Sequence, residues 1–233
     1  METGLRGKVA LITGGAGGIG QQICRGFANE GAKVAIHYHT STDEAVALAN
    51  ELGGLSFQAD LRSSSEADSL VQRINSEMGA LDICVANSGL YPTENLPLWE
   101  IDDDRWMRTI SSNLGVTANT ARSFLAHVSR TKSGSLVLVG STAGIFGEAG
   151  HSDYAAAKGA ITTGLLLSLK NEVSRIGPIR INAVAPGWTI TPKKAEDGLD
   201  AEVAERAMST MSLKKMATPE DVANSIIMLS SDL

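Results

Sequence analysis

The segment that decides the fold is Val9-Ala-Leu-Ile-Thr-Gly-Gly-Ala-Gly-Gly-Ile-Gly20, an apolar run followed at once by a glycine-rich turn. The run predicts a buried strand, and the helical spacing over residues 19–29 predicts a helix directly behind the turn. Glycine allows positive φ and a close backbone approach, while a helix N-terminus directs its N–H groups at an anion. We therefore expect a pyrophosphate-binding turn formed by Gly14, Ala16, Gly17, Gly18, Ile19 and Gly20. A turn that only reverses the chain is the alternative.

The rest of the chain repeats this order of apolar run and helical pattern. Runs of strand character at residues 33–37, 55–58, 82–86, 136–139 and 179–184 alternate with helical patterns at 42–52, 65–78, 102–129, 154–174 and 219–229. Runs this apolar suit strands that are covered on both faces. The pattern predicts a single α/β domain over residues 1–233, with a Rossmann-type, doubly wound parallel sheet in three α/β/α layers.

Composition narrows the class of protein. Hydrophobic residues make up 43% of the 233 residues and charged residues 20%, which is typical of a globular chain. The net charge of -6 argues against a nucleic-acid partner. No apolar run reaches the ~20 residues that a membrane helix needs, and we expect no membrane partner. Cys24 and Cys84 are predicted to be buried free thiols in a reducing compartment, so the expected location is the cytoplasm.

The end of the second predicted strand bears on the choice of nicotinamide cofactor. It reads His37-Tyr-His-Thr-Ser41 and carries no carboxylate at Tyr38 to bond the ribose hydroxyls of NAD. Because His39, Thr40 and Ser41 can donate hydrogen bonds to a 2′-phosphate, the sequence favours NADP(H) over NAD(H). Both histidines are interpreted as solvent-facing residues rather than a metal pair, and no metal site is predicted.

Candidate chemistry lies in the second half of the chain. Tyr154 and Lys158 are four residues apart at the start of a predicted helix, so their side chains share one face. An ammonium beside a phenol lowers the phenol pKa and makes it a better proton carrier. Ser141 follows a predicted strand at the carboxyl edge of the sheet, where open α/β folds bind ligands. It could donate a hydrogen bond to a substrate oxygen, or only cap a turn.

With these motifs in view, the chain resembles the short-chain dehydrogenase/reductase family over nearly its whole length. Thr13, Gly14, Gly18 and Gly20 match that family's glycine turn, and Ser141, Tyr154 and Lys158 match its catalytic set. Asp60, followed by Leu61, matches the acid that contacts the adenine in that family, and Asn87-Ser88-Gly89 matches a further motif. Asn113 matches the helix-kinking asparagine of the proton relay. Pro186-Gly187, with Thr189 and Thr191, matches the segment that holds the nicotinamide carboxamide.

The resemblance implies that Ser141 polarises a carbonyl and that Tyr154 protonates it as hydride arrives from the cofactor. Lys158 would hold the nicotinamide ribose and lower the tyrosine pKa, with Asn113 joining the relay. The implied activity is the interconversion of a carbonyl and a secondary alcohol with NAD(P)(H). A catalytically inactive cofactor-binding regulator is the alternative from another class.

The closest resemblance within the family is to 3-oxoacyl-(acyl-carrier-protein) reductases, which implies a 3-oxoacyl thioester reduced with NADPH. Lys132 and Arg175 match basic residues that contact acyl carrier protein in those enzymes, so acyl carrier protein is an implied partner. The expected substrate pocket contains Tyr91, Thr142, Ile145, His151 and Trp188, with residues 189–216 as a lid. His151 is interpreted as a solvent-facing loop residue rather than a second acid. An NAD-dependent dehydrogenase of a sugar, steroid or other secondary alcohol is the alternative.

Assembly is the last expectation. The helix that carries Tyr154 has small or apolar residues on nearly every side, which exceeds what one core face requires. We expect a second subunit on that helix, and the resemblance implies a homotetramer that also uses the helix after Asn113. The family pattern expects a further strand after residue 229, and that strand is missing from the sequence given.

Overall fold

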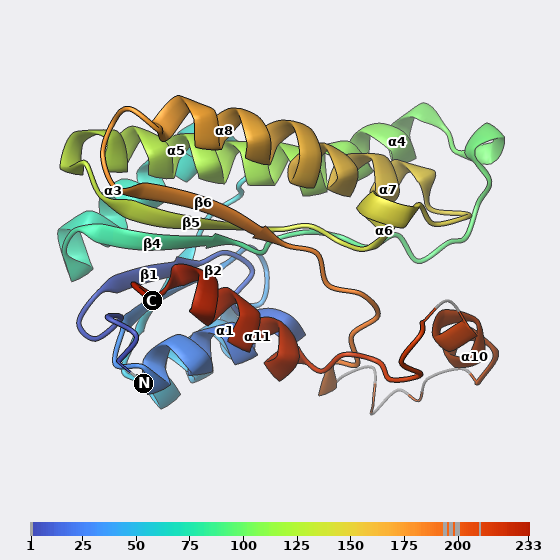
Figure 1. Cartoon of the computed structure of the whole chain (residues 1–233), viewed down its shortest axis with the longest axis horizontal. Coiled ribbons are helices and arrows are strands. Elements are labelled where there is room, and N and C mark those ends of the chain that lie inside the picture. Colours follow the sequence, from blue (N-terminus) through green and yellow to red (C-terminus); the bar gives the residue numbers. More distant parts are fainter. Residues whose placement is uncertain (1, 193–194, 196–197, 199–200, 210) are drawn as a thin grey trace.

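The computed structural model describes residues 2–192, 195, 198, 201–209 and 211–233, and its centre is one sheet between two helical layers (Figure 1). All neighbouring strands are parallel, in the order β3-β2-β1-β4-β5-β6. The bounds are β1 Val9–Ile12, β2 Lys33–Tyr38, β3 Leu55–Gln58, β4 Leu81–Ala86, β5 Gly134–Val139 and β6 Ile179–Val184. The order reverses between β1 and β4, and this switch point is where doubly wound sheets bind ligands. The predicted fold class is confirmed.

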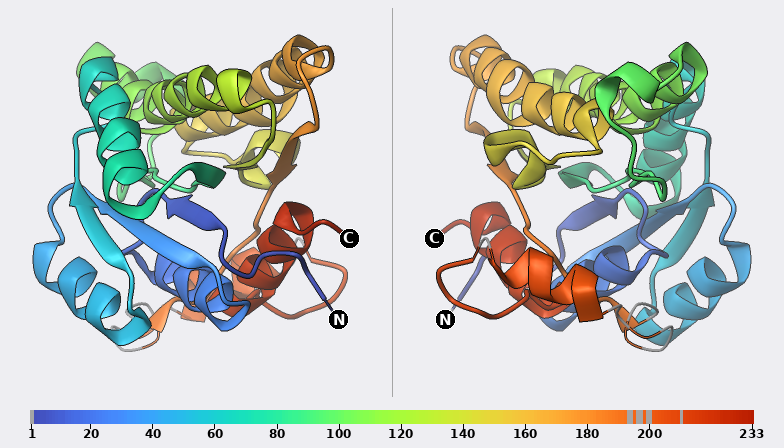
Figure 2. Two further views of the ribbon diagram at one scale, coloured as in Figure 1. Left: turned by 90° about the vertical axis from the view of Figure 1, so that its left-hand side faces the viewer. Right: turned by 90° about the vertical axis from the view of Figure 1, so that its right-hand side faces the viewer.

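Helices cover both faces of the sheet, as Figures 1 and 2 show. One layer contains α1 (Gly18–Asn29), α2 (Thr42–Leu52) and α11 (Pro219–Ser230), and the other contains α3 (Ser64–Met78), α5 (Val116–Thr131) and α8 (Leu166–Val173). Each layer has its own apolar cluster against the sheet, around Phe27 on one side and Phe124 on the other. Burial on both faces explains why the strand sequences are almost continuously apolar.

Two helices that the sequence predicts as continuous are each interrupted by a π-helical segment. Residues 102–129 divide into α4 (Asp103–Ile110), η2 (Ser111–Gly115) and α5, and residues 154–174 into α7 (Ser152–Gly159), η3 (Ala160–Leu165) and α8. In each case a side chain takes a backbone carbonyl near the break: Asn113 donates to the Thr109 carbonyl and Thr162 to that of Lys158. Such competition alters the helical hydrogen-bond ladder.

The residues that follow β6 and those that precede α11 meet in an isolated bridge. Thr189 and Ala217 form a parallel bridge, so the two ends of the predicted lid (residues 189–216) lie side by side. Between them lies α10 (Ala201–Ser209), while residues 193–194, 196–197, 199–200 and 210 of the lid fall outside the described residues. Thr218 begins α11 with a reciprocal capping box to Asp221. Among the described helices, none is both long and apolar enough to cross a membrane.

Candidate active site

The glycine turn between β1 and α1 is shaped by close backbone contacts. Gly14 has φ of +63°, a conformation that favours glycine. A Cβ on Gly20 would collide with the Gly14 carbonyl oxygen, and one on Gly18 would lie 2.7 Å from the Thr191 Cβ. Within the described chain, no side chain caps α1 at Gly17, and its first turn carries no acidic residue. This N-terminus can therefore receive an anion.

Thr13 and Asn87 join the turn to the end of β4. The Thr13 hydroxyl donates to the Val85 carbonyl and accepts from the backbone N–H groups of Asn87 (2.9 Å) and Ser88 (3.0 Å). The Asn87 amide donates in return to the Thr13 carbonyl at 3.0 Å. The motif residues at the ends of two neighbouring strands thus form one hydrogen-bonded unit.

His37 is a further support of the turn, and its interpretation as a solvent-facing residue was wrong. The side chain is 2% exposed because it points from β2 under the turn. Its Nδ1 accepts from the Gly14 N–H at 3.1 Å, so Nε2 carries the proton and donates to the Ala59 carbonyl at 3.0 Å. Burial lowers the pKa of His37 to about 4, which keeps the ring neutral.

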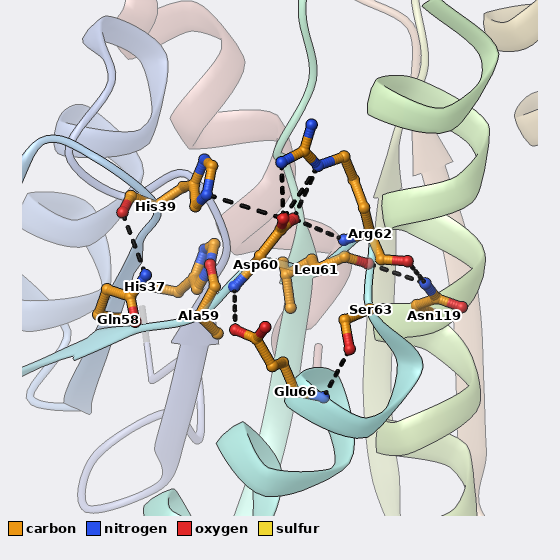
Figure 3. Close-up of polar contacts among 10 residues, drawn as sticks. All are labelled: His37, His39, Gln58, Ala59, Asp60, Leu61, Arg62, Ser63, Glu66 and Asn119. Atoms are coloured by element: carbon orange, nitrogen blue, oxygen red, sulfur yellow. Dashed lines mark hydrogen bonds and ion pairs between the residues drawn. The ribbon is translucent and has the colours of Figure 1, made fainter. Parts of the chain in front are cut away.

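Asp60 and Arg62 form an ion pair shortly after β3 (Figure 3). The Arg62 guanidinium donates to both carboxylate oxygens of Asp60, at distances of 2.6–3.1 Å. This contact holds the pKa of Asp60 at about 2. His39 Nε2 lies 3.8 Å from the same carboxylate and is half exposed, as expected for that residue. Sequence reasoning missed Arg62, although its spacing of two from Asp60 was a signal.

The glycine turn, His37, Asp60 and Arg62 border a cleft of about 540 Å³ along the carboxyl ends of β1, β2 and β3. The predicted cofactor residues that line it are Gly14, Ala16, Gly17, Gly18, Ile19, Gly20, Tyr38, His39, Thr40, Asp60, Leu61, Asn87, Ser88, Gly89 and Thr191. A glycine cradle that side chains would fill, beside an uncapped helix N-terminus, fits a dinucleotide. When bound, a nicotinamide dinucleotide would supply the hydride-transferring group.

A second cavity of about 240 Å³ continues from this cleft and contains the predicted catalytic set. Ser141, Tyr154 and Lys158 line it together with Asn113, Pro186, Gly187, Thr189 and Thr191. Tyr154 is half-buried and is hydrogen-bonded by Ser141, and the Lys158 Nζ lies 5.7 Å from the centre of the tyrosine ring. The structure therefore brings these predicted residues to one place.

The sequence predicts that Lys158 lowers the pKa of Tyr154, and the pKa shifts of these two groups in the structure differ from that expectation. Burial raises the pKa of Tyr154, and the opposing hydrogen bond from Ser141 does not cancel this effect. Lys158 is 3% exposed and donates to the Val139 carbonyl at 3.0 Å. Burial lowers its own pKa to about 8. Desolvation thus has the largest effect on both groups.

Asn113 lies in the π-helical segment η2 and is completely buried. Its amide donates to the carbonyls of Leu90 (2.9 Å) and Thr109 (3.0 Å), and its oxygen accepts from the Leu90 N–H. A Cβ on Gly89 would lie 2.7 Å from this oxygen and 3.1 Å from the Lys158 Nζ. Asn113 and Lys158 therefore meet at the glycine that follows Asn87-Ser88.

A buried ion pair supports the start of α7, next to Tyr154. Asp153 is 0% and Arg105 5% exposed, with 3.1 Å between the Arg105 Nε and the Asp153 Oδ2. Thr109 donates to the same oxygen at 2.8 Å. Burial opposes ionisation, yet the bonds from Arg105 and Thr109 hold the pKa of Asp153 below its usual value. The pair joins α4 to α7.

The predicted substrate residues divide into three groups. Tyr91, Thr142 and Trp188 line the catalytic cavity. Ile145 is 55% exposed and lines neither this cavity nor the larger cavity of about 750 Å³ that adjoins it. The interpretation of His151 as a solvent-facing residue was wrong, because it is 4% exposed and stacks on Tyr91 with ring centres 4.6 Å apart. Sequence reasoning also missed Glu148 in the cavity wall, three residues before His151.

The two basic residues that suggested a carrier-protein contact lie at the other edge of the sheet. Lys132 is the C-cap of α5, directly before β5, and Arg175 lies between α8 and β6. The catalytic residues follow the opposite ends of β5 and β6. Because a six-residue strand spans about 20 Å, this pair does not border the cavity within one chain.

Comparisons with known proteins agree with this geometry. The family model described as short chain dehydrogenase matches residues 8–202. A cis-4-hydroxycyclohexanecarboxylate dehydrogenase of Sinomonas cyclohexanicum is 36% identical over 97% of this chain and 90% of its own length. A 3-oxoacyl-(acyl-carrier-protein) reductase of Thermotoga maritima is 33% identical over 98% and 92%. The corresponding reductase of Staphylococcus aureus is 30% identical over 97% and 91%.

A solved structure shares the fold throughout. The crystal structure of gox2181 superposes with a TM-score of 0.92 and 25% identity, covering 100% of this chain and 92% of that one. Sequence motifs, site geometry and relatives therefore agree. The chain belongs to the short-chain dehydrogenase family and is an oxidoreductase that acts on CH–OH or C=O groups.

Proposed function

We propose that the protein interconverts a ketone and a secondary alcohol with a nicotinamide dinucleotide, with NADP(H) preferred and a 3-oxoacyl thioester as the first candidate substrate. The observation that carries this proposal is the single cavity shared by Ser141, Tyr154 and Lys158, open to the glycine-turn cleft. Tyr154 exchanges the proton with the substrate oxygen, and Ser141 donates a hydrogen bond to that oxygen. Lys158 binds the nicotinamide ribose, with Asn113 holding the surrounding backbone.

The preference for NADP(H) is supported by the charges in the cleft. Asp60 is the carboxylate that lines it in the described residues, and Arg62 already neutralises that group. His39, Thr40 and Ser41 border the end of β2 and can donate to a 2′-phosphate. A His39→Asp variant is expected to shift the kcat/KM ratio towards NADH by about tenfold or more, because a carboxylate repels the phosphate.

A 3-oxoacyl thioester is supported by the two reductase relatives and by the space beyond the catalytic cavity. A cavity of about 750 Å³ adjoins it between α6 (Ala143–Phe146) and α10, with Phe146, Ala207 and Met211 in its wall. This largely apolar space can accept an acyl chain. Contact with an acyl carrier protein through Lys132 and Arg175 belongs to the same proposal.

A dehydrogenase of a cyclic secondary alcohol is the second candidate. The observation that favours it is the 36% identity to the Sinomonas cyclohexanicum dehydrogenase, over nearly the whole of both chains. The opposite placement of Lys132 and Arg175 also weakens the support for a carrier-bound substrate.

Initial rates separate the candidates. Purified protein is assayed with NADPH and NADH against a 3-oxoacyl thioester and cyclic ketones, and in reverse with NADP⁺ and NAD⁺ against the corresponding alcohols. Faster turnover of the thioester with NADPH supports the first candidate. Faster turnover of the cyclic pair selects the second. Binding of NADPH with no turnover in either direction would leave the inactive regulator.

A homotetramer in the cytoplasm completes the proposal. Leu98, Trp99 and Met107 are exposed on η1 (Leu98–Glu100) and α4, and Leu167 on α8. Apolar residues of this size at a surface favour a subunit contact. Sedimentation of a stable, active monomer would contradict this assembly.

A further inference from the structure

Glu148 lies where the two substrate-side cavities meet. It lines both the catalytic cavity and the larger cavity against α10, as do Thr142, Gly187 and Trp188. A substrate that reaches Tyr154 and extends into the larger cavity must therefore pass this side chain. The Glu148 side chain is 23% exposed, so it is partly removed from water but still faces the opening.

The position of the carboxylate is fixed by aromatic neighbours. The Tyr91 hydroxyl donates to the Glu148 Oε1 at 2.7 Å. The Tyr91 ring stacks on His151 and meets the Tyr154 ring edge-on, with ring centres 5.1 Å apart. Tyr91 thus contacts both the Glu148 carboxylate and the ring of Tyr154. Glu148 also adds to the effect of burial in raising the pKa of Tyr154, so its negative charge is felt at the reacting group.

The cationic groups of these cavities have other contacts. Lys158 lines the catalytic cavity but not the larger one, and its ammonium donates to the Val139 carbonyl. Lys215 lines the outer cavity, 3.9 Å from Asp221. His151 Nδ1 lies 3.8 Å from the Glu148 Oε1 and is charged only when protonated. At a pH where histidine is neutral, the wall between the cavities is therefore negative.

We infer that Glu148 determines which substrates the site accepts, by excluding those with a carboxylate near the reacting carbon and admitting neutral or cationic ones. The inference rests on the proposed function and names its substrate class. A thioester or an uncharged cyclic ketone meets this condition. The relative from Sinomonas cyclohexanicum is named for a carboxylate substrate, so the inference predicts a different substrate range for this chain.

The test uses a matched pair of ligands, 4-oxocyclohexanecarboxylate and its carboxamide, which differ in charge but little in shape. Their dissociation constants for the NADP⁺ complex, which has no hydride to give to a ketone, are measured by calorimetry at pH 8, where an ordinary imidazole is neutral. The proteins compared are the wild type, Glu148→Gln and the control Glu100→Gln. Glutamine keeps an acceptor for the Tyr91 hydroxyl, and Glu100 is an exposed residue of η1 that lines neither cavity.

We expect the wild type and Glu100→Gln to bind the carboxamide about tenfold or more tightly than the carboxylate. In Glu148→Gln the two constants should agree within about threefold, mainly through tighter binding of the carboxylate. Equal binding of both ligands by the wild type, or a preference that persists in Glu148→Gln, would overturn the inference, as would a failure of the wild type to bind the carboxamide. Because binding is measured without turnover, a failure of the proposed function is recognised separately, by the absence of hydride exchange with any substrate.

Discussion

Arg105→Met is expected to destabilise the fold strongly by leaving Asp153 buried without its cation. Asp153 is 0% exposed, and its Oδ2 accepts hydrogen bonds from the Arg105 Nε and the Thr109 hydroxyl. Removing one partner of a buried pair costs about 3–5 kcal/mol of the free energy of unfolding. Arg108→Met removes an exposed arginine from the same helix and should cost less than about 0.5 kcal/mol.

The pH dependence and a double variant sharpen this prediction. In the wild type the pKa of Asp153 is lowered, so its stabilising contribution is present above the ordinary carboxyl value near 4 and is lost as pH falls below it. In Arg105→Met the buried carboxyl should have a raised pKa, so the deficit measured at pH 7 should shrink as pH falls towards 5. Because Arg105 and Asp153 are in direct contact and the double variant leaves neither charge buried without its partner, Arg105→Met with Asp153→Asn should cost less than the sum of the single variants.

Urea unfolding followed by circular dichroism measures these free energies. A loss of less than about 1 kcal/mol in Arg105→Met at pH 7 would refute the reasoning, since it would mean that the buried carboxylate needs no cation. An equal loss in Arg108→Met would do the same, because it would trace the effect to helix α4 rather than to the pair.

Three further predictions concern the site. Lys158→Met should raise the free energy of unfolding by about 1–3 kcal/mol below pH 8, because burial lowers the pKa of Lys158 to about 8 and its charged form destabilises the fold. The wild type regains this stability as the pH rises, so the gain should disappear by about pH 10.5. Urea titrations at pH 7 and pH 10.5 check both values. Gly20→Ala should weaken NADPH binding by about tenfold or more, since the added methyl group meets the Gly14 carbonyl, while Gly164→Ala, whose Cβ meets nothing, should bind normally in a fluorescence titration. Asn113→Ala should lose three hydrogen bonds and about 2–4 kcal/mol of unfolding free energy. A calorimetric unfolding temperature equal to that of the wild type would disprove this prediction.

The motifs that depend on local sequence could be predicted well. The glycine turn needs only a strand, a helix and residues without Cβ, so Gly14 to Gly20 identified its place and its shape. The Tyr154–Lys158 spacing placed both side chains on one helical face, and the position of Ser141 after β5 set it beside them. The parallel direction of the strands followed from apolar runs that alternate with helices, since parallel strands require crossovers.

Features that depend on three-dimensional packing could not be predicted from the sequence. Burial of His37 and His151 follows from which neighbours cover each ring, and neither periodicity nor composition encodes that. The π-helical segments arise where Asn113 and Thr162 compete for backbone carbonyls, a local choice that leaves the helical apolar pattern unchanged. Ion pairs such as Arg62–Asp60 and Arg105–Asp153 depend on side-chain geometry after folding.

The role of Tyr154 in proton transfer is tested most directly by the rate of deuteride transfer in wild type and Tyr154→Phe. NADPH deuterated at C4 of the nicotinamide is mixed with a ketone that the wild type reduces, and deuterium in the alcohol is followed by mass spectrometry. We predict deuterium on the carbinol carbon with the wild type, and a rate at least about 100-fold lower with Tyr154→Phe, at unchanged NADPH affinity. A Tyr154→Phe rate close to that of the wild type would contradict the account.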